Sequence, residues 1–289
     1  MFPARRISLS FLAYLVALTG ATMLAEDSES QGIPPDAAGG TLQRGVPLNN
    51  LPHHPFANAS GASNLIDHGG RIVPNSNIYY IWWGNQNAWP TDATAGLTAL
   101  ASGLNGSSFL NGIFPQYMRV SGVATAYKQS LYDASAPPTR GPKTSTIVAE
   151  ACKVISANGL NPDPTAIYMV LTSNFPGRVN YCAWHSYGNC NGTTIQVAYL
   201  PNTTGVSGCN DPVLTCNGYS EGTNSIANVL SHEFSEAITD ATASAWYDSS
   251  GSEIGDKCAW QFQSCVNLTS GSWQLQMEWS NSRSGCLQQ

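Results

Sequence analysis

Three residues in the C-terminal third of the chain have the types and spacing of a metal-dependent hydrolase. His232 and Glu236 are four positions apart, and Glu233 directly follows the histidine. On an α-helix, positions i and i+4 lie about 40° apart around the axis and roughly 6 Å apart along it, so both side chains point the same way. The pattern is a variant of His-Glu-x-x-His, in which two histidines bind zinc and the glutamate is the general base. Glu236 replaces the second histidine, and a carboxylate also binds Zn²⁺.

A third metal ligand has to come from another part of the chain. Catalytic zinc commonly takes three protein ligands and keeps a fourth position open, and His232 and Glu236 would supply two. Asp256 is the first candidate for the third, because its segment follows the helix and can fold back over it. His185 and Asp240 are the alternatives. Asp240 is i+8 from His232, about 80° away around the axis, and reaches the ion only if the helix ends early.

The same residues indicate how such a site would work. Glu233 would be the general base that takes a proton from water, while zinc polarises the carbonyl of a peptide bond. His185, in a Tyr-Cys-x-x-His element, would stabilise an oxyanion or bind substrate. The alternative for His185 is a histidine that is only hydrogen-bonded within a disulfide loop. Because two carboxylate ligands make the metal less electrophilic than two histidines and one carboxylate, we expect weak or specialised hydrolysis.

Three other interpretations compete with a peptidase. The helix can be an ordinary amphipathic one, with a half-buried histidine and two exposed carboxylates. Alternatively, oxygen ligands after the helix would cage Ca²⁺ in a non-catalytic, exported or wall-associated binding module; these ligands are Asp248, Ser250, Glu253 and Asp256. A glycosidase pair ranks last, because Glu233 and Glu236 on one helix do not face each other across a sugar.

Hydrophobic periodicity predicts the elements that must position these residues. The helix of the motif spans residues 223–240, with apolar residues at Ile226, Val229, Leu230, Phe234 and Ala237. Two more helices are expected at residues 92–104 and 143–158. Strands are expected at residues 71–73, 77–83, within 117–131, 166–172, 179–188, 194–200 and 273–279. This order favours an α+β (mixed α/β) layer fold, with helices packed on a mixed sheet and a disulfide-rich C-terminal part.

Composition and the N-terminus indicate an exported protein. Residues 1–25 have the pattern of a secretory signal, with Arg5 and Arg6 before an apolar run. Residues 26–68, rich in proline and glycine, are expected to form a flexible linker, and residues 69–289 a single domain. The net charge of −6 offers no basic patch, so nucleic acid is not an expected partner. We expect a secreted, extracellular or periplasmic monomer without a membrane anchor after signal cleavage, acting on a peptide or an extracellular polymer.

All eight cysteines follow the predicted signal, and an even number in an exported chain indicates disulfides. Full pairing of eight cysteines allows 105 arrangements, and sequence alone does not choose among them. Cys209 and Cys216 flank a turn-rich loop and are a candidate local pair.

Several separated motifs resemble, in the same order, those of the secreted EXORDIUM or phosphate-induced protein family. They are residues 78–84, 181–185, 231–237, 245–246 and 253–256, together with Asp240 and Cys258. The resemblance covers roughly residues 70–289 and implies an extracellular protein associated with growth and the cell wall. The order of helices and strands is also similar to the zincin metallopeptidases. It implies an ancestral metallopeptidase site that this chain keeps in part, since it lacks the second helical histidine.

Overall fold

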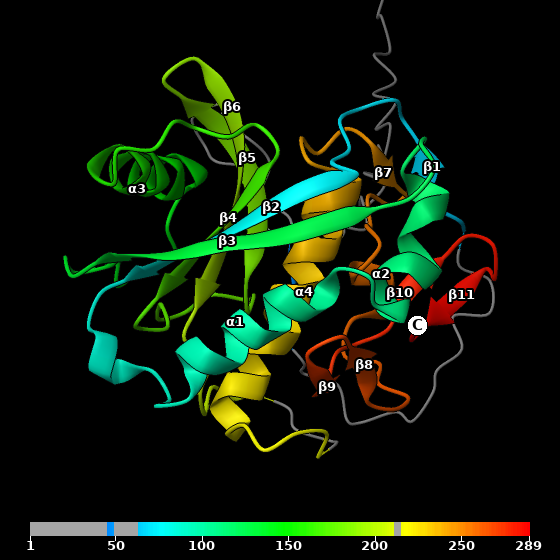
Figure 1. The fold of residues 1–289 in the computed structure, drawn as a ribbon. Coiled ribbons are helices and arrows are strands. Elements are labelled where there is room, and N and C mark those ends of the chain that lie inside the picture. Colours follow the sequence, from blue (N-terminus) through cyan, green and yellow to red (C-terminus); the bar gives the residue numbers. More distant parts are fainter. Residues whose placement is uncertain (1–44, 49–62, 211–214) are drawn as a thin grey trace, which may run out of the picture.

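A computed structural model describes residues 45–48, 63–210 and 215–289 (Figure 1). Its largest sheet has the strand order β3-β2-β4-β6-β5. These strands are β2 (Asn75–Trp83), β3 (Ala124–Asp133), β4 (Ala166–Thr172), β5 (Trp184–Cys190) and β6 (Thr193–Pro201). The first four in the order run parallel, whereas β5 pairs antiparallel with β6 at the edge. The fold is therefore α+β with a mixed sheet, as the order of elements predicted.

Helices cover both faces of this sheet. On one face lies α3 (Thr144–Ala157), and on the other lie α1 (Ala93–Leu104) and α4 (Glu221–Thr239) (Figure 1). Parallel neighbours need long crossover connections. One crossover, from β2 to β3, contains α1 and the short α2 (Ser108–Ile113), and α3 forms the crossover from β3 to β4. The sheet is thus buried between two helical layers.

The C-terminal part adds a layer of small elements on the far side of α4 (Figure 1). Antiparallel pairs form between β1 (Ile66–Asp67) and β7 (Trp246–Tyr247), β8 (Val266–Leu268) and β9 (Gly271–Trp273), and β10 (Glu278–Ser280) and β11 (Gly285–Leu287). Short 3₁₀ helices are η1 (Gln86–Ala88), η2 (Phe114–Tyr117) and η3 (Asp256–Cys258). The last of these, η3, folds back onto α4, where the Asp256 amide donates to Glu236 Oε1 at 3.1 Å.

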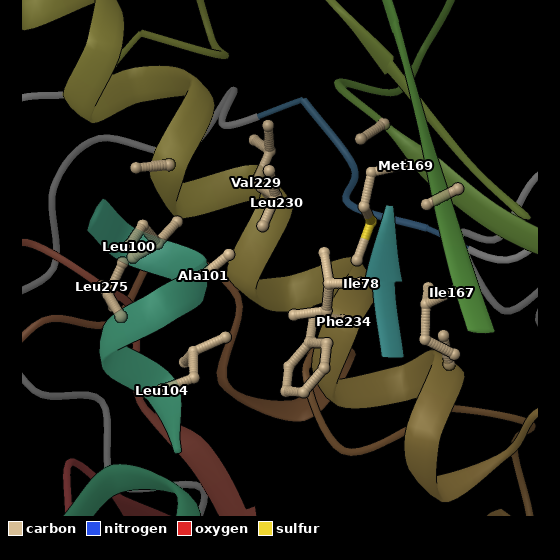
Figure 2. Close-up of a cluster of buried hydrophobic side chains, with 14 of the residues drawn as sticks. Ile78, Leu100, Ala101, Leu104, Ile167, Met169, Val229, Leu230, Phe234 and Leu275 are labelled. Atoms are coloured by element: carbon tan, nitrogen blue, oxygen red, sulfur yellow. The ribbon is translucent and has the colours of Figure 1, made fainter. Parts of the chain in front are cut away.

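Alternation along the strands divides the core into two clusters. On β2, Ile78 joins the cluster that faces α1 and α4. Ile81, three positions along and so on the opposite face of the strand, joins the cluster that faces α3. Figure 2 shows Ile78 and Met169 against Phe234 of α4. Burying a large apolar side chain stabilises the fold by about 1.5–3 kcal/mol. This packing fixes where α4 lies on the sheet.

Nearly every side chain of α4 is buried, which differs from the amphipathic helix with exposed carboxylates considered above. Glu233 and Glu236 are both 0% exposed. The physical reason is that the C-terminal layer covers the side of α4 that faces away from the sheet. The helix begins at Glu221, two residues before the predicted start, because the Ser220 hydroxyl accepts a hydrogen bond from the Thr223 amide at 3.3 Å and caps it.

Two predicted strands differ in the structure. Residues 71–73 form no strand, although the Val73 amide donates to the Ile238 carbonyl at the end of α4. The alternation over residues 273–279 predicts one closing strand. The structure instead contains only the end of β9 and the start of β10 there, separated by residues 274–277. Each end pairs with its own short partner, so tertiary pairing overrides the local pattern.

Disulfides join all eight cysteines: Cys152–Cys190, Cys182–Cys209, Cys216–Cys265 and Cys258–Cys286. The predicted Cys209–Cys216 pair is therefore wrong. Each of these two cysteines pairs instead with a residue distant in sequence, which ties the loop before α4 to the β5 region and to the C-terminal layer. Four disulfides indicate folding in an oxidising environment.

The predicted signal, residues 1–25, lies outside the described residues, as does most of the predicted linker. Two parts of the segment 26–68 do pack on the domain: residues 45–48, and residues 63–68 with strand β1. Leu65 is 4% exposed, so its apolar burial explains why this part joins the domain. Within the described ranges, no helix has the length and apolar character needed to traverse a bilayer.

Candidate metal centre

The predicted helical pair forms the base of a buried cluster. His232 Nε2 lies 3.0 Å from Glu236 Oε1, one turn along α4. Both side chains are 0% exposed. The i and i+4 spacing therefore does direct an imidazole and a carboxylate to one point, as the sequence predicted.

Asp256 completes this group from η3. Its Oδ1 lies 3.8 Å from His232 Nε2, and its backbone amide donates to Glu236 Oε1 at 3.1 Å. One ligand atom from each of His232, Glu236 and Asp256 lies within 4.8 Å of the others. The segment after the helix folds back over it, which is the arrangement on which the choice of Asp256 depended.

His232 is held by two neighbours on its other sides. Gln276 Nε2 lies 2.9 Å from His232 Nδ1 and donates to the Gly255 carbonyl at 3.0 Å. Gly255 itself packs on the ring: a Cβ at this position would lie 2.8 Å from His232 Nδ1. Because a side chain at Gly255 would displace the imidazole or the loop, glycine is required for this close approach. The imidazole orientation is thus set by contacts outside α4.

A second group of donors shares Glu236. His185 Nδ1, on edge strand β5, lies 3.3 Å from both Glu233 Oε2 and Glu236 Oε2. His185 Nε2 lies 3.7 Å from Glu253 Oε1. His185, Glu233 and Glu236 again offer atoms within 4.8 Å of one another. Glu236 therefore stands between two histidines, with one oxygen toward each.

The carboxylates impose a strong demand for positive charge. Burial disfavours the charged form of His232, but Glu236, Glu233 and Asp256 together outweigh it and raise the pKa of His232 to about 10. Burial likewise opposes charge on His185, yet Glu253, Glu233 and Glu236 raise its pKa well above the usual value. For Asp256, burial and then Glu236 raise the pKa to about 7. Protons on the imidazoles and a divalent cation are alternative sources of the missing charge.

Buried atoms without a hydrogen-bond partner show that the donors fit a metal ion. Among the described residues, His232 Nε2 and Glu236 Oε2 are buried and accept or donate no hydrogen bond. His232 Nε2 is close to a Glu236 oxygen but not aligned with it as a hydrogen bond. Unsatisfied buried polar atoms are costly and call for an explanation, such as an ion. One imidazole and two carboxylates form a donor set suited to zinc.

Two predicted ligands lie elsewhere. Asp240 belongs to neither group, because its Oδ1 accepts hydrogen bonds from the Ser244 and Ala245 amides at 2.5 and 2.6 Å. It follows the last residue of α4 and organises the turn there. Asp248, a member of the predicted calcium cage, pairs with Lys257 at 2.6 Å. That ammonium group takes the place a cation would have, so the three acids and the serine do not form one cage.

Sequence reasoning missed three residues at the site. Gln276 contacts His232, and Glu278 is buried with its Oε1 accepting from Ser235 Oγ at 3.1 Å. Val46 donates its backbone amide to Glu233 Oε1 at 3.2 Å. Gln276 and Glu278 lie in the alternating segment over residues 273–279, which the sequence predicts as a strand.

Comparison with known proteins does not identify this chain. No protein family matches the sequence, and no curated protein matches it either. One solved structure with a resemblance is metalloproteinase-II from Bacteroides fragilis, at 8% sequence identity and a TM-score of 0.31. The match covers 64% of this chain and 51% of that chain, which is about half its length. A similarity this small carries no weight for fold or activity, so function has to be inferred from the site.

Proposed function

We propose that this chain is a secreted, zinc-dependent peptidase whose ion is held by His232, Glu236 and Asp256. The observation that carries the proposal is the convergence of these donors within 4.8 Å, with His232 and Glu236 buried and Asp256 partly exposed. The resemblance of the motifs to the EXORDIUM family supports an extracellular location, and the zincin-like order of elements supports a metallopeptidase site. Four disulfides fit an exported protein.

The chain's own residues divide the chemistry among them. When bound, zinc would polarise a scissile carbonyl and lower the pKa of a water molecule. Glu233, next to His232 on α4, would take a proton from that water and deliver it to the leaving amine. His185, 3.3 Å from Glu233 Oε2, would hold this carboxylate and place positive charge beside the developing oxyanion.

The second donor group defines the alternative arrangement. If His185, Glu233 and Glu236 hold the ion, Glu233 is a ligand and not free to act as a base. We favour the first group because His232 Nε2 is buried and has no hydrogen-bond partner. The two arrangements differ in what the removal of the Glu233 charge does to metal binding.

Metal analysis of Glu233→Gln separates these arrangements. We expect about one zinc ion per chain in wild type and in the variant, with cleavage of a peptide library reduced about 10²–10⁴-fold in the variant. Glu221→Gln, an exposed glutamate at the start of the same helix, is the matched control and should keep both properties. Loss of zinc from Glu233→Gln would assign the ion to the second group.

Two further outcomes would overturn the proposal. Purified wild-type protein that binds calcium and not zinc would favour the calcium-dependent binding module. The absence of peptide cleavage by zinc-loaded protein would exclude peptidase activity, provided that cleavage is absent both with residues 45–48 in place and with these residues displaced.

A further inference from the structure

A short N-terminal segment lies directly against the candidate base. Residues 45–48, which we call the strap, are distant in sequence from every other residue of the site. The Val46 amide donates to Glu233 Oε1 at 3.2 Å. Val46 is 0% exposed and belongs to the large core cluster. The general base is thus covered by a piece of the same chain.

The strap is bound as an extended peptide is bound at a sheet edge. The Cys182 amide donates to the Val46 carbonyl at 2.8 Å, and the Leu48 amide donates to the Asn180 carbonyl at 3.2 Å. Between these bonds Pro47 forms an antiparallel bridge with Tyr181. These partners immediately precede β5, which carries His185. Main-chain hydrogen bonds of this kind provide affinity for peptides in β-strand addition.

The strap is also gripped from its other side. Trp260, in the C-terminal layer, donates its indole Nε1–H to the Pro47 carbonyl at 2.9 Å. The strap therefore lies between the segment before β5 and the loop after η3. These two regions directly adjoin β5 and η3, which carry His185 and Asp256.

One strap position accepts no side chain. A Cβ on Gly45 would lie 2.2 Å from the Ala183 carbonyl oxygen and 2.4 Å from Trp184 Cα, and both contacts are with backbone. Backbone does not move aside as a flexible side chain does, so any larger residue has to leave this position. By contrast, a Cβ on Gly177 would meet no atom within 4 Å.

We propose that the strap occupies a peptide-binding groove beside Glu233 in the manner of a substrate and closes the metal cluster to outside peptides. The proposal rests on the peptidase function above and names its substrate class and its regulation. An amide N–H on the general base is the group that a peptide substrate presents there. The groove, once vacated, takes an extended peptide with glycine followed by a branched apolar residue.

Closure follows from competition within one chain. A tethered segment has an effective concentration in the millimolar range, so a free peptide binds only to the fraction of molecules whose strap is displaced. The apparent affinity of an outside peptide is its intrinsic affinity multiplied by that fraction. Displacing the strap should therefore reveal a groove that the wild-type chain conceals.

The test uses the full chain and a fluorescein-labelled peptide, Arg-Gly-Val-Pro-Leu-amide, which has the sequence of residues 44–48. Binding is measured by fluorescence anisotropy on ice, and mass spectrometry checks that the peptide stays intact. Gly45→Val should displace the strap and bind the peptide at least about tenfold more tightly than wild type. Gly177→Val, the matched control in open space, should bind as wild type does. A peptide with valine in place of its glycine should not bind Gly45→Val.

Val46→Asp provides a second way to displace the strap, because it places a carboxylate against buried Glu233 while the probe keeps its valine. Circular dichroism and the unfolding midpoint confirm that each variant is folded. Equal, weak binding by wild type and by both folded strap variants would overturn the proposal, as would equal binding of the valine-substituted peptide. Anisotropy reports binding and not catalysis, so the two proposals can fail separately. Tighter peptide binding by the strap variants without any peptide cleavage would refute the peptidase function alone. Peptide cleavage without tighter binding by the strap variants would refute the role of the strap alone.

Discussion

Two groups of acidic side chains on opposite faces of the sheet differ in how their charge is balanced. On the α3 side, Glu150 Oε2 lies 2.6 Å from Lys153 Nζ, and the same ammonium group contacts Asp133. On the α4 side, Glu236 faces His232 and His185. Among the described residues, no lysine or arginine forms an ion pair with Glu236.

The difference separates a structural ion pair from a cluster whose carboxylates face imidazoles and not a fixed ammonium group. Lys153 is always available, half exposed, and holds the pKa of Asp133 well below its usual range against the opposing effect of burial. In the α4 cluster the positive charge has to come from protons on imidazoles or from an ion in solution. A cluster of acids with a fixed ammonium group is therefore interpreted as a structural ion pair, and a cluster without one as a candidate metal site.

The largest effect we expect comes from removing the shared carboxylate. Glu236→Gln removes a ligand from both donor groups and leaves two buried imidazoles with one partner fewer. Loss of one partner from a buried pair costs about 3–5 kcal/mol. The free energy of unfolding of the metal-free protein, measured by guanidinium titration, should fall by this amount, and zinc binding should be lost.

Glu150→Gln is the matched control in the α3 cluster. Burial raises the pKa of Glu150 to about 7, so this carboxyl group is already partly neutral near neutral pH. Lys153 is exposed and keeps Asp133, so we expect a change within about 1 kcal/mol and normal zinc binding. Equal destabilisation by the two variants would mean that the two clusters do not differ as described.

A smaller effect should follow from the neighbour that orients His232. A metal-ligating histidine donates its other ring N–H, and such partners typically contribute 10–100-fold to metal affinity. Gln276 is the partner of His232 Nδ1, and its amide oxygen can accept that N–H after rotation of the amide, which gives up the hydrogen bond to the Gly255 carbonyl. Gln276→Leu should weaken zinc binding about 10–100-fold in a competition titration with a chelator. Rescue by Gln276→Glu, which restores an acceptor, would distinguish orientation from simple loss of packing.

Local patterns predicted the elements that alternate or repeat over many residues. The spacing of apolar residues identified α4, and the buried runs identified β4 and β6. The same spacing predicted that His232 and Glu236 converge, since this depends only on helix geometry. Asp256 lies beside His232 and Glu236 because the segment after the helix folds back over it, which is the path that the sequence analysis considered.

Features that depend on distant contacts were not predictable in the same way. Gln276 and Glu278 lie in an alternating segment whose polar side chains face a buried cluster, because α4 and not solvent lies against them. Cys209 pairs with Cys182, which directly precedes β5, and not with Cys216, which is nearer in sequence. Val46 lies in a segment without periodicity, and its position against Glu233 depends on a sheet edge more than a hundred residues later.

The pH dependence should distinguish metal-free from metal-loaded protein. In metal-free protein the pKa of His232 is raised to about 10 from 6.5, so protonation of His232 stabilises the fold. This contribution is fully present below pH 6.5 and is lost as pH rises toward 10. Thermal unfolding without metal should therefore show a falling midpoint over this window. Zinc needs the neutral imidazole, so its affinity should rise by up to about tenfold per pH unit there. A metal-free midpoint that rises over the window would contradict the assignment.

The smallest effect is expected at Asp240, the aspartate of the motif that lies outside both donor groups. Its Oδ1 accepts two backbone amides in the turn after α4. Asp240→Asn keeps an oxygen at this place but weakens charge-assisted hydrogen bonds, so the free energy of unfolding should fall by about 1 kcal/mol. Zinc affinity should be unchanged, because the turn holds Asp240 away from His232. A loss of zinc in this variant comparable to that of Glu236→Gln would make Asp240 a ligand and would remove Asp256 from that role.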